Sequence, residues 1–569
     1  MTFSTISDII YKLRFLIVVV VLSSILLFFK IGDRHLWYKD EGRYAEIPRE
    51  MVATGDYIAP HLNYVKYFEK PVLCYWMTAL SYKAFGVNEF AARFPMALLG
   101  LITICAVYLF GKEFFGEREG FLSTLILLAT IGFYLVNRYV VLDGPFTCFF
   151  TVSMCLIWAG YRKNRLSYCL LAYASMGCAV LTKGLIGVVL PVLIVGSYIL
   201  VTRKWNVVKK LCIVRGVLVF CAVTVPWFYM VTRAHPEFFN FFFIQEHFLR
   251  YLTDAAGRQE PFYFFLIIGS IFFAPWTVFV PVAIKKLFQI KDENVKSTLI
   301  FLNIWWVAIL VFFSLSQSKL PPYILPMVPA LALVVGNIWG DFLWREKYVN
   351  GMKNAFIVAI CALLGLIVYV LWEVFTSLKT DVDAPIILPY IVPGISLFMI
   401  IVAVLTGVVI VIKKQGVQTS LVTKKIAFCG ILIPLLVSYI FIISAMEKLD
   451  TTQSSYVFVE EIAKRDPENR SRVVIIGRNE HFSDLGFYLK KRIVLVGDDW
   501  GELNFGKSYD TSEKYFLSIE DFLKSLDPNE KVYCVLKKSS YNDWVKDSLP
   551  DFHIIKDMRK RLLISNVKE

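Results

Sequence analysis

The chain has 569 residues, of which 57% are hydrophobic and 19% are charged. Soluble globular proteins contain roughly 45–50% apolar and about 25% charged residues, so this composition excludes an ordinary soluble enzyme, a disordered protein and a collagen-like fibre. It indicates a polytopic membrane protein. The formal net charge of +14 fits either nucleic-acid binding or a basic cytoplasmic membrane face combined with an anionic substrate.

Apolar runs predict about thirteen transmembrane helices, because a spanning helix needs about 20 mostly apolar residues. Between the fifth and sixth runs, Thr182-Lys183-Gly184 predicts a tight hairpin, since one continuous helix there would be too long for a single crossing. The runs lie near residues 13–30, 92–110, 120–137, 144–160, 166–182, 184–202, 212–231, 262–284, 297–315, 321–340, 354–376, 386–412 and 424–446.

Lysine and arginine follow these runs in an alternating pattern. If the N-terminus is cytoplasmic, every connection on that side is basic, as at Lys209-Lys210 and Lys413-Lys414, whereas the short opposite connections carry few basic residues. This is the positive-inside pattern. It accounts for much of the net charge without nucleic acid, and an odd number of spans places the C-terminus outside.

The composition changes after Met446. Short apolar runs at 473–476, 493–496, 532–535 and 552–555 predict strands, and the stretches 483–490, 518–526 and 540–548 between them predict helices. We therefore expect a polytopic α-helical membrane domain over residues 1–446 and a small soluble α/β domain over residues 447–569.

The first long exterior loop, residues 31–91, is dense in ionisable and aromatic side chains. A carboxylate at the outer membrane face can act as a general base or orient an acceptor, and a lysine there can bind an anionic headgroup or phosphate. The alternatives are a solvated amphipathic helix and snorkelling side chains. The residues concerned are Asp40, Glu41, Arg43 and Tyr44, followed by Tyr67, Glu69 and Lys70.

The second exterior loop, residues 232–261, places His247, Arg250 and Arg258 among aromatic residues. Arginine forks suit the recognition of a phosphate. The alternative is an amphipathic helix lying on anionic lipid. A lone histidine is more often structural than a metal ligand, and sequence spacing does not show whether His247 and Glu69 share a divalent ion.

Three further candidates lie on the same predicted side. Asp143 stands at the mouth of a helix, where it is either functional or an N-cap. Lys319 and Tyr323 are four residues apart and can face one cavity, although Pro321-Pro322 between them can simply break the backbone. The α/β domain has no Gly-rich GxGxxG turn and is predicted to lie outside the cytoplasm. A lipid-borne phosphate donor therefore fits better than a nucleotide donor.

The motifs together resemble those of a known family. The segments Asp40-Glu41-Gly42-Arg43-Tyr44-Ala45-Glu46-Ile47, Phe68-Glu69-Lys70-Pro71, Leu142-Asp143-Gly144-Pro145 and Ser318-Lys319-Leu320-Pro321-Pro322-Tyr323 resemble the dolichyl-phosphate-mannose protein mannosyltransferase superfamily. Within it they are most similar to the bacterial lipid A 4-amino-4-deoxy-L-arabinose transferases, which have the GT-C fold.

The resemblance implies an inverting glycosyltransferase of the bacterial inner membrane, with a cytoplasmic N-terminus and a periplasmic C-terminal domain. Its donor would be a polyprenyl-phosphate-linked sugar and its acceptor lipid A or another envelope molecule, among membrane lipids and without nucleic acid. By motif, Asp40 and Asp143 are the catalytic carboxylates. Glu69 and His247 match residues that can hold a divalent metal ion. The substrate contacts are Glu41, Arg43, Tyr44, Tyr67, Lys70, Arg250, Arg258, Lys319 and Tyr323.

Two alternatives remain open at this point. A related enzyme with the same fold would transfer another sugar, or would use protein serine and threonine as acceptors. A lipid flippase or transporter would place ionisable groups near the bilayer midplane. The apolar runs here are nearly free of charge at mid-depth, which favours a one-sided enzyme.

Overall fold

The structure is a computed structural model that describes residues 3–249, 259–380, 384–510, 512 and 514–567. The side chains of residues 3–12, 247–249, 377–380, 384–387 and 544 lie outside that description. The chain divides into two compact units. Unit 1 comprises Met1–Phe29, Met96–Thr376 and Pro389–Ile442, and unit 2 comprises Lys30–Pro95, Ser377–Leu388 and Ile443–Glu569.

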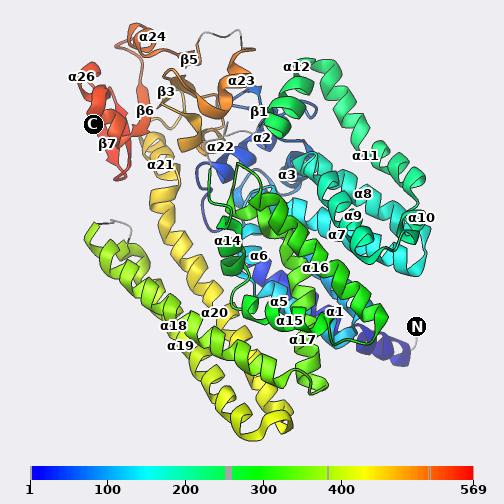
Figure 1. The fold of residues 1–569 in the computed structure, drawn as a ribbon. Helices are drawn as coiled ribbons and strands as arrows, with labels where there is room; N and C mark the ends of the chain where they lie inside the picture. The colour runs from blue at the N-terminus through cyan, green and yellow to red at the C-terminus, as the bar shows by residue number, and fades with distance from the viewer. Residues whose placement is uncertain (1–2, 250–258, 381–383, 511, 513, 568–569) are drawn as a thin grey trace. The chain divides into compact units, whose positions relative to one another are not determined.

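Unit 1 is built from apolar helices, and α4, α18, α19 and α20 also have residues in unit 2 (Figure 1). Its helical elements are α1 Phe3–Phe28, α4 Glu89–Phe114, α5 Glu117–Leu128, α6 Ile131–Val136, α7 Asp143–Lys163, α8 Leu166–Lys183, α9 Ile186–Thr202, α10 Asn206–Lys210, α11 Ile213–Ala234, α12 Glu237–Phe239, η1 Asn240–Leu249, α14 Phe264–Phe272, η2 Trp276–Phe279, α15 Val280–Leu287, α16 Glu293–Ser314, η3 Pro321–Met327, α17 Val328–Trp344, α18 Val349–Thr380, α19 Ala384–Gln415, η4 Gly416–Gln418 and α20 Leu421–Gln453.

The thirteen predicted runs are all largely helical, but thirteen separate spans are not confirmed. Among the described residues, nine helices are long and apolar enough to cross a membrane, or ten if one bent pair counts as a single span. That pair, Phe264–Phe272 with Trp276–Leu287, turns by 103°. The run near 120–137 forms the two short helices α5 and α6. The predicted hairpin is confirmed, because α8 ends at Lys183 and α9 begins at Ile186.

Helix α17 lies at the centre of unit 1. The window Pro321–Trp344 is 94% buried, more than any other candidate span in the described chain. Close packing against α5 depends on Gly336, since a Cβ there would lie 2.1 Å from Oγ of Ser123. Small residues allow helix backbones to approach in this way inside a membrane protein.

Unit 2 contains a six-stranded sheet with the order β5-β4-β3-β6-β8-β7 (orange to red in Figure 1). The first four strands in this order are parallel to one another. Strand β8 is antiparallel to both of its neighbours, β6 and β7. The strands are β3 Arg472–Ile476, β4 Val494–Val496, β5 Phe516–Leu517, β6 Val532–Lys537, β7 His553–Asp557 and β8 Arg561–Ser565. The helical elements around them are α21 Tyr456–Arg465, η5 Asn479–His481, α22 Leu485–Leu489, η6 Gly501–Leu503, α23 Asn504–Lys507, α24 Ile519–Lys524, α25 Lys538–Ser540, η7 Tyr541–Val545 and α26 Lys546–Ser548.

Both faces of this sheet are buried, as expected for parallel strands. Alternate residues of β3 point to opposite faces: Val474 packs with Phe522 and Val545, whereas Ile475 packs with Phe458 and Leu485. The predicted α/β domain is therefore present, with helical segments on each side of one sheet.

The predicted exterior loop 31–91 belongs to the same compact unit as this sheet. It forms α2 Asp40–Thr54, the two-stranded hairpin of β1 His61–Leu62 and β2 Val65–Lys66, and α3 Leu73–Phe85. The amide of Asn63 makes two hydrogen bonds with the backbone of Ile493, of 2.9 and 2.8 Å. A Cβ on Gly42 would lie 2.4 Å from the backbone nitrogen of Asp484, so only glycine permits this approach of α2.

Candidate active site

The first acidic candidate, Asp40, is the first residue of α2 and has a 55% exposed side chain. Its carboxylate pairs with Arg43 one turn along the helix. Arg43 also pairs with Glu502, which lies in η6 beyond the carboxyl end of β4. The guanidinium therefore joins an exposed carboxylate to a buried one, since the side chain of Glu502 is only 4% exposed.

Burial and pairing act on these two groups in opposite directions. Burial raises the pKa of Glu502 to about 7, although Arg43 and Asn479 stabilise its ionised form. The pKa of Arg43 is raised above its usual range, because attraction to Glu502 and to Asp40 outweighs burial. The cationic Arg43 lies 4.7 Å from the ring of Tyr44 and 5.9 Å from that of Tyr67.

Tyr67, Glu69 and Lys70 continue this cluster between β2 and α3. The Tyr67 hydroxyl donates to Oε2 of Glu69 at 3.0 Å, and Nζ of Lys70 donates to the carbonyl of Glu69 at 2.9 Å. Burial raises the pKa of Tyr67, which keeps its hydroxyl protonated. Unit 2 thus brings together six of the seven candidates of the first loop, and the exception is Glu41.

Glu41 points elsewhere, into a buried ion-pair network. Its fully buried carboxylate contacts Arg34 at 2.7 Å and Arg93 at 2.9 Å. Burial alone would raise its pKa, but the two arginines lower it. Arg93 also donates to the backbone carbonyls of Ile31, Arg34 and His35. In this structure Glu41 therefore stabilises the entry to α2.

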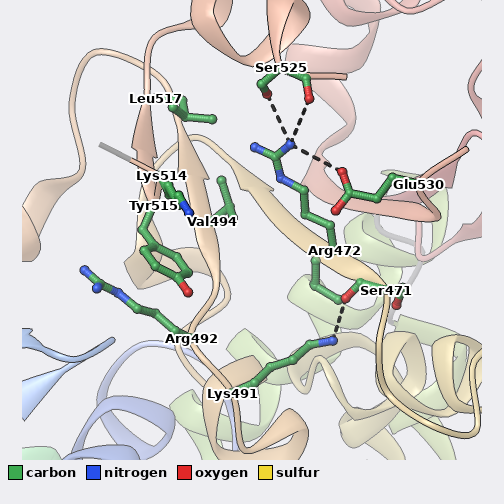
Figure 2. A pocket seen from close by; sticks show the side chains of 11 residues that line it. Ser471, Arg472, Lys491, Arg492, Val494, Lys514, Tyr515, Leu517, Ser525 and Glu530 are labelled. Carbon is green, nitrogen blue, oxygen red and sulfur yellow. Dashed lines mark hydrogen bonds and ion pairs between the residues drawn. The ribbon is translucent and has the colours of Figure 1, made fainter. Parts of the chain in front are cut away.

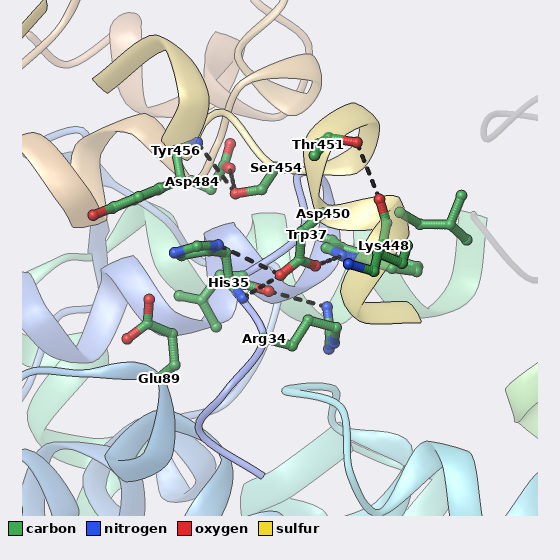
Figure 3. A network of polar contacts seen from close by, with 12 residues as sticks. Arg34, His35, Trp37, Glu89, Lys448, Asp450, Thr451, Ser454, Tyr456 and Asp484 are labelled. Atoms are coloured by element: carbon green, nitrogen blue, oxygen red, sulfur yellow. Dashed lines mark hydrogen bonds and ion pairs between the residues drawn. The ribbon is translucent and has the colours of Figure 1, made fainter. Parts of the chain in front are cut away.

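A second network fixes the chain just before Asp40 (Figure 3). Asp450, near the end of α20, accepts hydrogen bonds from the backbone of His35 at 2.7 Å and from the indole of Trp37 at 2.6 Å. The ring of His35 stacks on Tyr456 with centroids 3.9 Å apart. Because these contacts hold the residues preceding α2, they limit the positions that Asp40 can take.

The second acidic candidate, Asp143, begins α7 in unit 1. It forms an ion pair with Lys183, the last residue of α8, and both side chains are about 15% exposed or less. Nζ of Lys183 lies 4.5 Å from the ring of Tyr323. Unit 1 therefore gathers two predicted candidates, Asp143 and Tyr323, around a lysine that the predicted site omitted.

The remaining candidates are divided. Lys319 is buried, and its ammonium donates to the carbonyl of Glu260 at 2.8 Å. Arg250 and Arg258 lie outside the described residues, as does the side chain of His247. The predicted metal pair of Glu69 and His247 therefore stays a prediction. Among the described residues, no three His, Cys, Asp or Glu side chains are placed to share a metal ion.

Three residues of these networks are not among the predicted site residues: Glu502, Lys183 and Arg93. Glu502 lies in a polar stretch of the α/β domain, 459 residues after Arg43, and no local pattern marks it. Lys183 carried a usable signal, since it is a lone cation at a hairpin tip between two apolar runs. Arg93 begins an apolar run, where a charge needs a buried partner.

Comparisons with known proteins agree with this architecture. Residues 69–230 match the family model described as dolichyl-phosphate-mannose-protein mannosyltransferase, and residues 464–566 match the one described as aminoarabinose transferase C-terminal domain. The chain is similar over 98% of its length to the crystal structure of ArnT from Cupriavidus metallidurans bound to undecaprenyl phosphate, with 99% of that chain covered, a TM-score of 0.81 and 28% identity.

Curated relatives extend the match. An undecaprenyl phosphate-alpha-4-amino-4-deoxy-L-arabinose arabinosyl transferase of Pseudomonas fluorescens (strain Pf0-1) is 33% identical over 59% of this chain, which spans 62% of that relative's length. One from Erwinia tasmaniensis is 27% identical over 91% of this chain and 92% of its own. The fold is that of the GT-C membrane glycosyltransferases. Within that class, the chain is similar to ArnT over nearly its whole length.

Proposed function

We propose that this protein transfers 4-amino-4-deoxy-L-arabinose from undecaprenyl phosphate to a phosphate of lipid A. The observation that carries the proposal is the near full-length similarity to an ArnT structure that holds undecaprenyl phosphate. The names of the curated relatives supply the sugar. The match of residues 464–566 to an aminoarabinose transferase domain supports the same assignment.

The proposed location is the bacterial inner membrane, with the reaction at the periplasmic face. Two observations support this orientation. The basic residues alternate as the positive-inside rule requires. The cluster of Asp40, Arg43 and Lys70 shares a compact unit with the C-terminal α/β sheet. The N-terminus would then be cytoplasmic and the sheet periplasmic.

In the proposed reaction, an oxygen of the acceptor phosphate attacks the anomeric carbon of the donor. The bond from that carbon to the undecaprenyl phosphate oxygen breaks, and undecaprenyl phosphate leaves with the bonding electrons. A single displacement inverts the anomeric centre. Positive charge around the leaving phosphate stabilises the transition state. The residues proposed to supply it are Lys70, Arg250, Arg258 and Lys319, with Tyr323 as a hydrogen-bond donor.

Asp40 would orient the acceptor. A phosphate acceptor is already anionic and needs little assistance from a base, so positioning is the main contribution. Arg43 is suited to hold Asp40, because Glu502 and the rings of Tyr44 and Tyr67 fix the guanidinium. Arg43, Tyr44 and Tyr67 would therefore act through Asp40, and Glu41 would act from the buried network behind it.

Asp143 and Lys183 would form the second functional pair. Their ion pair lies beside Tyr323, which the motif assigns to the donor phosphate. A lysine held by one carboxylate can turn its remaining N–H groups toward a phosphate oxygen. The pair would thus supply a positioned cation for the leaving group, with Asp143 setting the position of Lys183.

A direct test is transfer by the purified full-length protein in detergent, with undecaprenyl-phosphate-linked aminoarabinose and lipid A. Mass spectrometry should show lipid A heavier by one aminopentose. The product would not form if the protein were a flippase, which needs a sealed bilayer. Transfer of another sugar, or transfer to serine and threonine of envelope proteins, would support the related-enzyme alternative.

A further inference from the structure

The sheet of unit 2 has a topological switch point between β3 and β6. The segment after β3 forms α22, whose Leu485 packs on one face of the sheet. The segment after β6 leads to η7, whose Val545 packs on the opposite face. Two parallel neighbours whose connections leave to opposite faces create a crevice at their carboxyl ends, and ligands of open α/β sheets bind in such crevices.

A cavity of about 470 Å³ lies at this crevice, which is within the usual size range of small-molecule sites. His481, after β3, and Ser539, after β6, line it, and Tyr38 reaches it from the segment before α2. We call it the switch-point pocket. Its other lining residues are all cations: Lys39, Lys537, Lys538, Arg559, Lys560 and Arg561.

No carboxylate lines the switch-point pocket among the described residues. Asp557 at its edge pairs with Lys538, and Glu480 lies 3.8 Å from the imidazole of His481. A surplus of positive charge remains. Its effect is visible at His481, where burial, Lys537 and Lys39 lower the imidazole pKa to about 4.

A second cavity on the same sheet provides a contrast (Figure 2). It lies at the amino ends of β3 and β4. Three of its four cations have partners within the protein: Arg472, Lys491 and Arg492, the last paired with Asp510. Arg472 bonds to Oγ of Ser525 at 3.1 Å and lies 3.7 Å from Glu530. Lys491 donates to the carbonyl of Ser471 at 2.8 Å. In the switch-point pocket, by contrast, Lys39, Lys537 and Lys560 are exposed at its wall.

The pocket is also coupled to the candidate active site by the chain itself. Lys39 immediately precedes Asp40, so their Cα atoms are about 3.8 Å apart. Lys39 has φ 71° and ψ −113°, a backbone conformation that a non-glycine residue adopts only when its surroundings impose it. Oγ of Ser483 donates to its carbonyl at 2.8 Å, and the backbone of Tyr38 donates to Gln453 at 3.1 Å.

Arg561 forms the floor of the pocket. It is 5% exposed and donates to the carbonyls of Thr452 and Ser454, at 2.8 and 3.1 Å. Its guanidinium lies 4.4 Å from the ring of Tyr38. Arg561 is therefore held by these contacts and by attraction to the buried Asp484, whereas the exposed lysines at the rim remain able to turn toward a ligand.

We propose that the switch-point pocket binds an anionic phosphate on the sugar headgroup of the acceptor glycolipid, distinct from the phosphate that receives the transferred sugar. The proposal rests on the proposed function for the identity of the acceptor. The pocket would hold one end of the headgroup while Asp40, one residue from Lys39, orients the other. Its preferred ligand is therefore an acceptor with two phosphates.

The test uses the full-length protein in nanodiscs and the variant Lys537→Ala/Lys560→Ala, which removes two exposed rim cations. The matched control is Lys514→Ala/Lys524→Ala, which removes two exposed lysines of the same unit outside the pocket. With bisphosphorylated lipid A, the pocket variant should raise the acceptor KM about tenfold, equivalent to about 1.4 kcal/mol, and leave kcat and the donor KM unchanged. The control should match the wild type.

A binding measurement separates the pocket from the reaction. Phosphatidylcholine vesicles carrying bisphosphorylated lipid A should bind the pocket variant about tenfold more weakly than the control, whether or not the wild type catalyses transfer. Inorganic phosphate is the second probe. The proposal would be overturned if the pocket variant and the control bound the vesicles equally. It would also be overturned if the pocket variant lost affinity for free phosphate but not for the vesicles.

Discussion

The ionisation of Glu502 should make the stability of the protein depend on pH in a way that a single substitution removes. The carboxyl group is fully buried, and its pKa is raised from an ordinary value near 4.5 to about 7. The folded protein therefore binds this proton more tightly than the unfolded chain does. Stability from the protonated form is complete below pH 4.5 and is lost as the pH rises to about 7.

The size of the effect follows from the shift. One pKa unit corresponds to about 1.4 kcal/mol, so the free energy of unfolding should fall by roughly 3 kcal/mol across this window because of Glu502 alone. In Glu502→Gln the side chain keeps its shape and has no proton to lose. The free energy of unfolding of the wild type minus that of the variant should be measured at pH 5 and again at pH 8. Taking this difference removes the contributions of the other titrating groups, which both proteins share.

The same substitution should change transfer. When Glu502 is neutral, Arg43 is left with Asp40 as its carboxylate partner and holds it more tightly, so that Asp40 is less available to the acceptor. Wild-type activity should fall as the pH drops through 7, and Glu502→Gln at pH 8 should resemble the wild type at pH 6.

Urea titration monitored by pulse proteolysis at several pH values measures the stability difference, and the pH–rate profile measures the second effect. A difference between wild type and Glu502→Gln that stays constant from pH 5 to pH 8 would refute the assignment of a raised pKa to Glu502. A variant that keeps the wild-type inflection near pH 7 would remove Glu502 from the control of Asp40.

Three further substitutions test the networks separately. Asp40→Asn should lower transfer at least about 100-fold with little change in folding, since Asp40 is 55% exposed; near-normal turnover, measured with purified protein, would exclude Asp40 from the reaction. Lys183→Met should destabilise the protein by about 3 kcal/mol, because it leaves Asp143 without its ion pair. In the double variant Lys183→Met/Asp143→Asn, the thermal midpoint should recover but transfer should not. Recovery of both the midpoint and transfer would make the pair purely structural. Arg93→Met should destabilise by about 3–5 kcal/mol, because Glu41 and three carbonyls lose a buried donor, and an unchanged midpoint would contradict that network.

The sequence predicted the elements whose pattern is local. Apolar runs located the membrane helices and four of the six strands of the C-terminal sheet. It missed β5 and β8. β5 has only two residues, Phe516–Leu517, which is too short for any periodicity. β8 is a run of five near the end of the chain, and its position next to β6 depends on pairing rather than on pattern.

The same limit applies to the candidate site, whose roles stay predictions. The sequence drew attention to Asp40, Arg43 and Lys70 because they lie in compact motifs beside apolar runs. Glu502 could not, because its contact with Arg43 spans 459 residues and arises only when α2 approaches the end of β4. Glu41 is a different case: its motif predicts a substrate contact, which stays a prediction, and the structure adds that two arginines hold its buried carboxylate inside the fold.

The pairing of Asn63 with Ile493 has a consequence for biosynthesis. The two residues are 430 positions apart, and a ribosome adding about 5–20 residues per second needs roughly 20–90 s to bridge them. During that interval the segment containing α2 and α3 has emerged without the strands that complete its fold. Nascent chains stalled before residue 493 should therefore expose this segment to proteases, and a full-length chain should protect it.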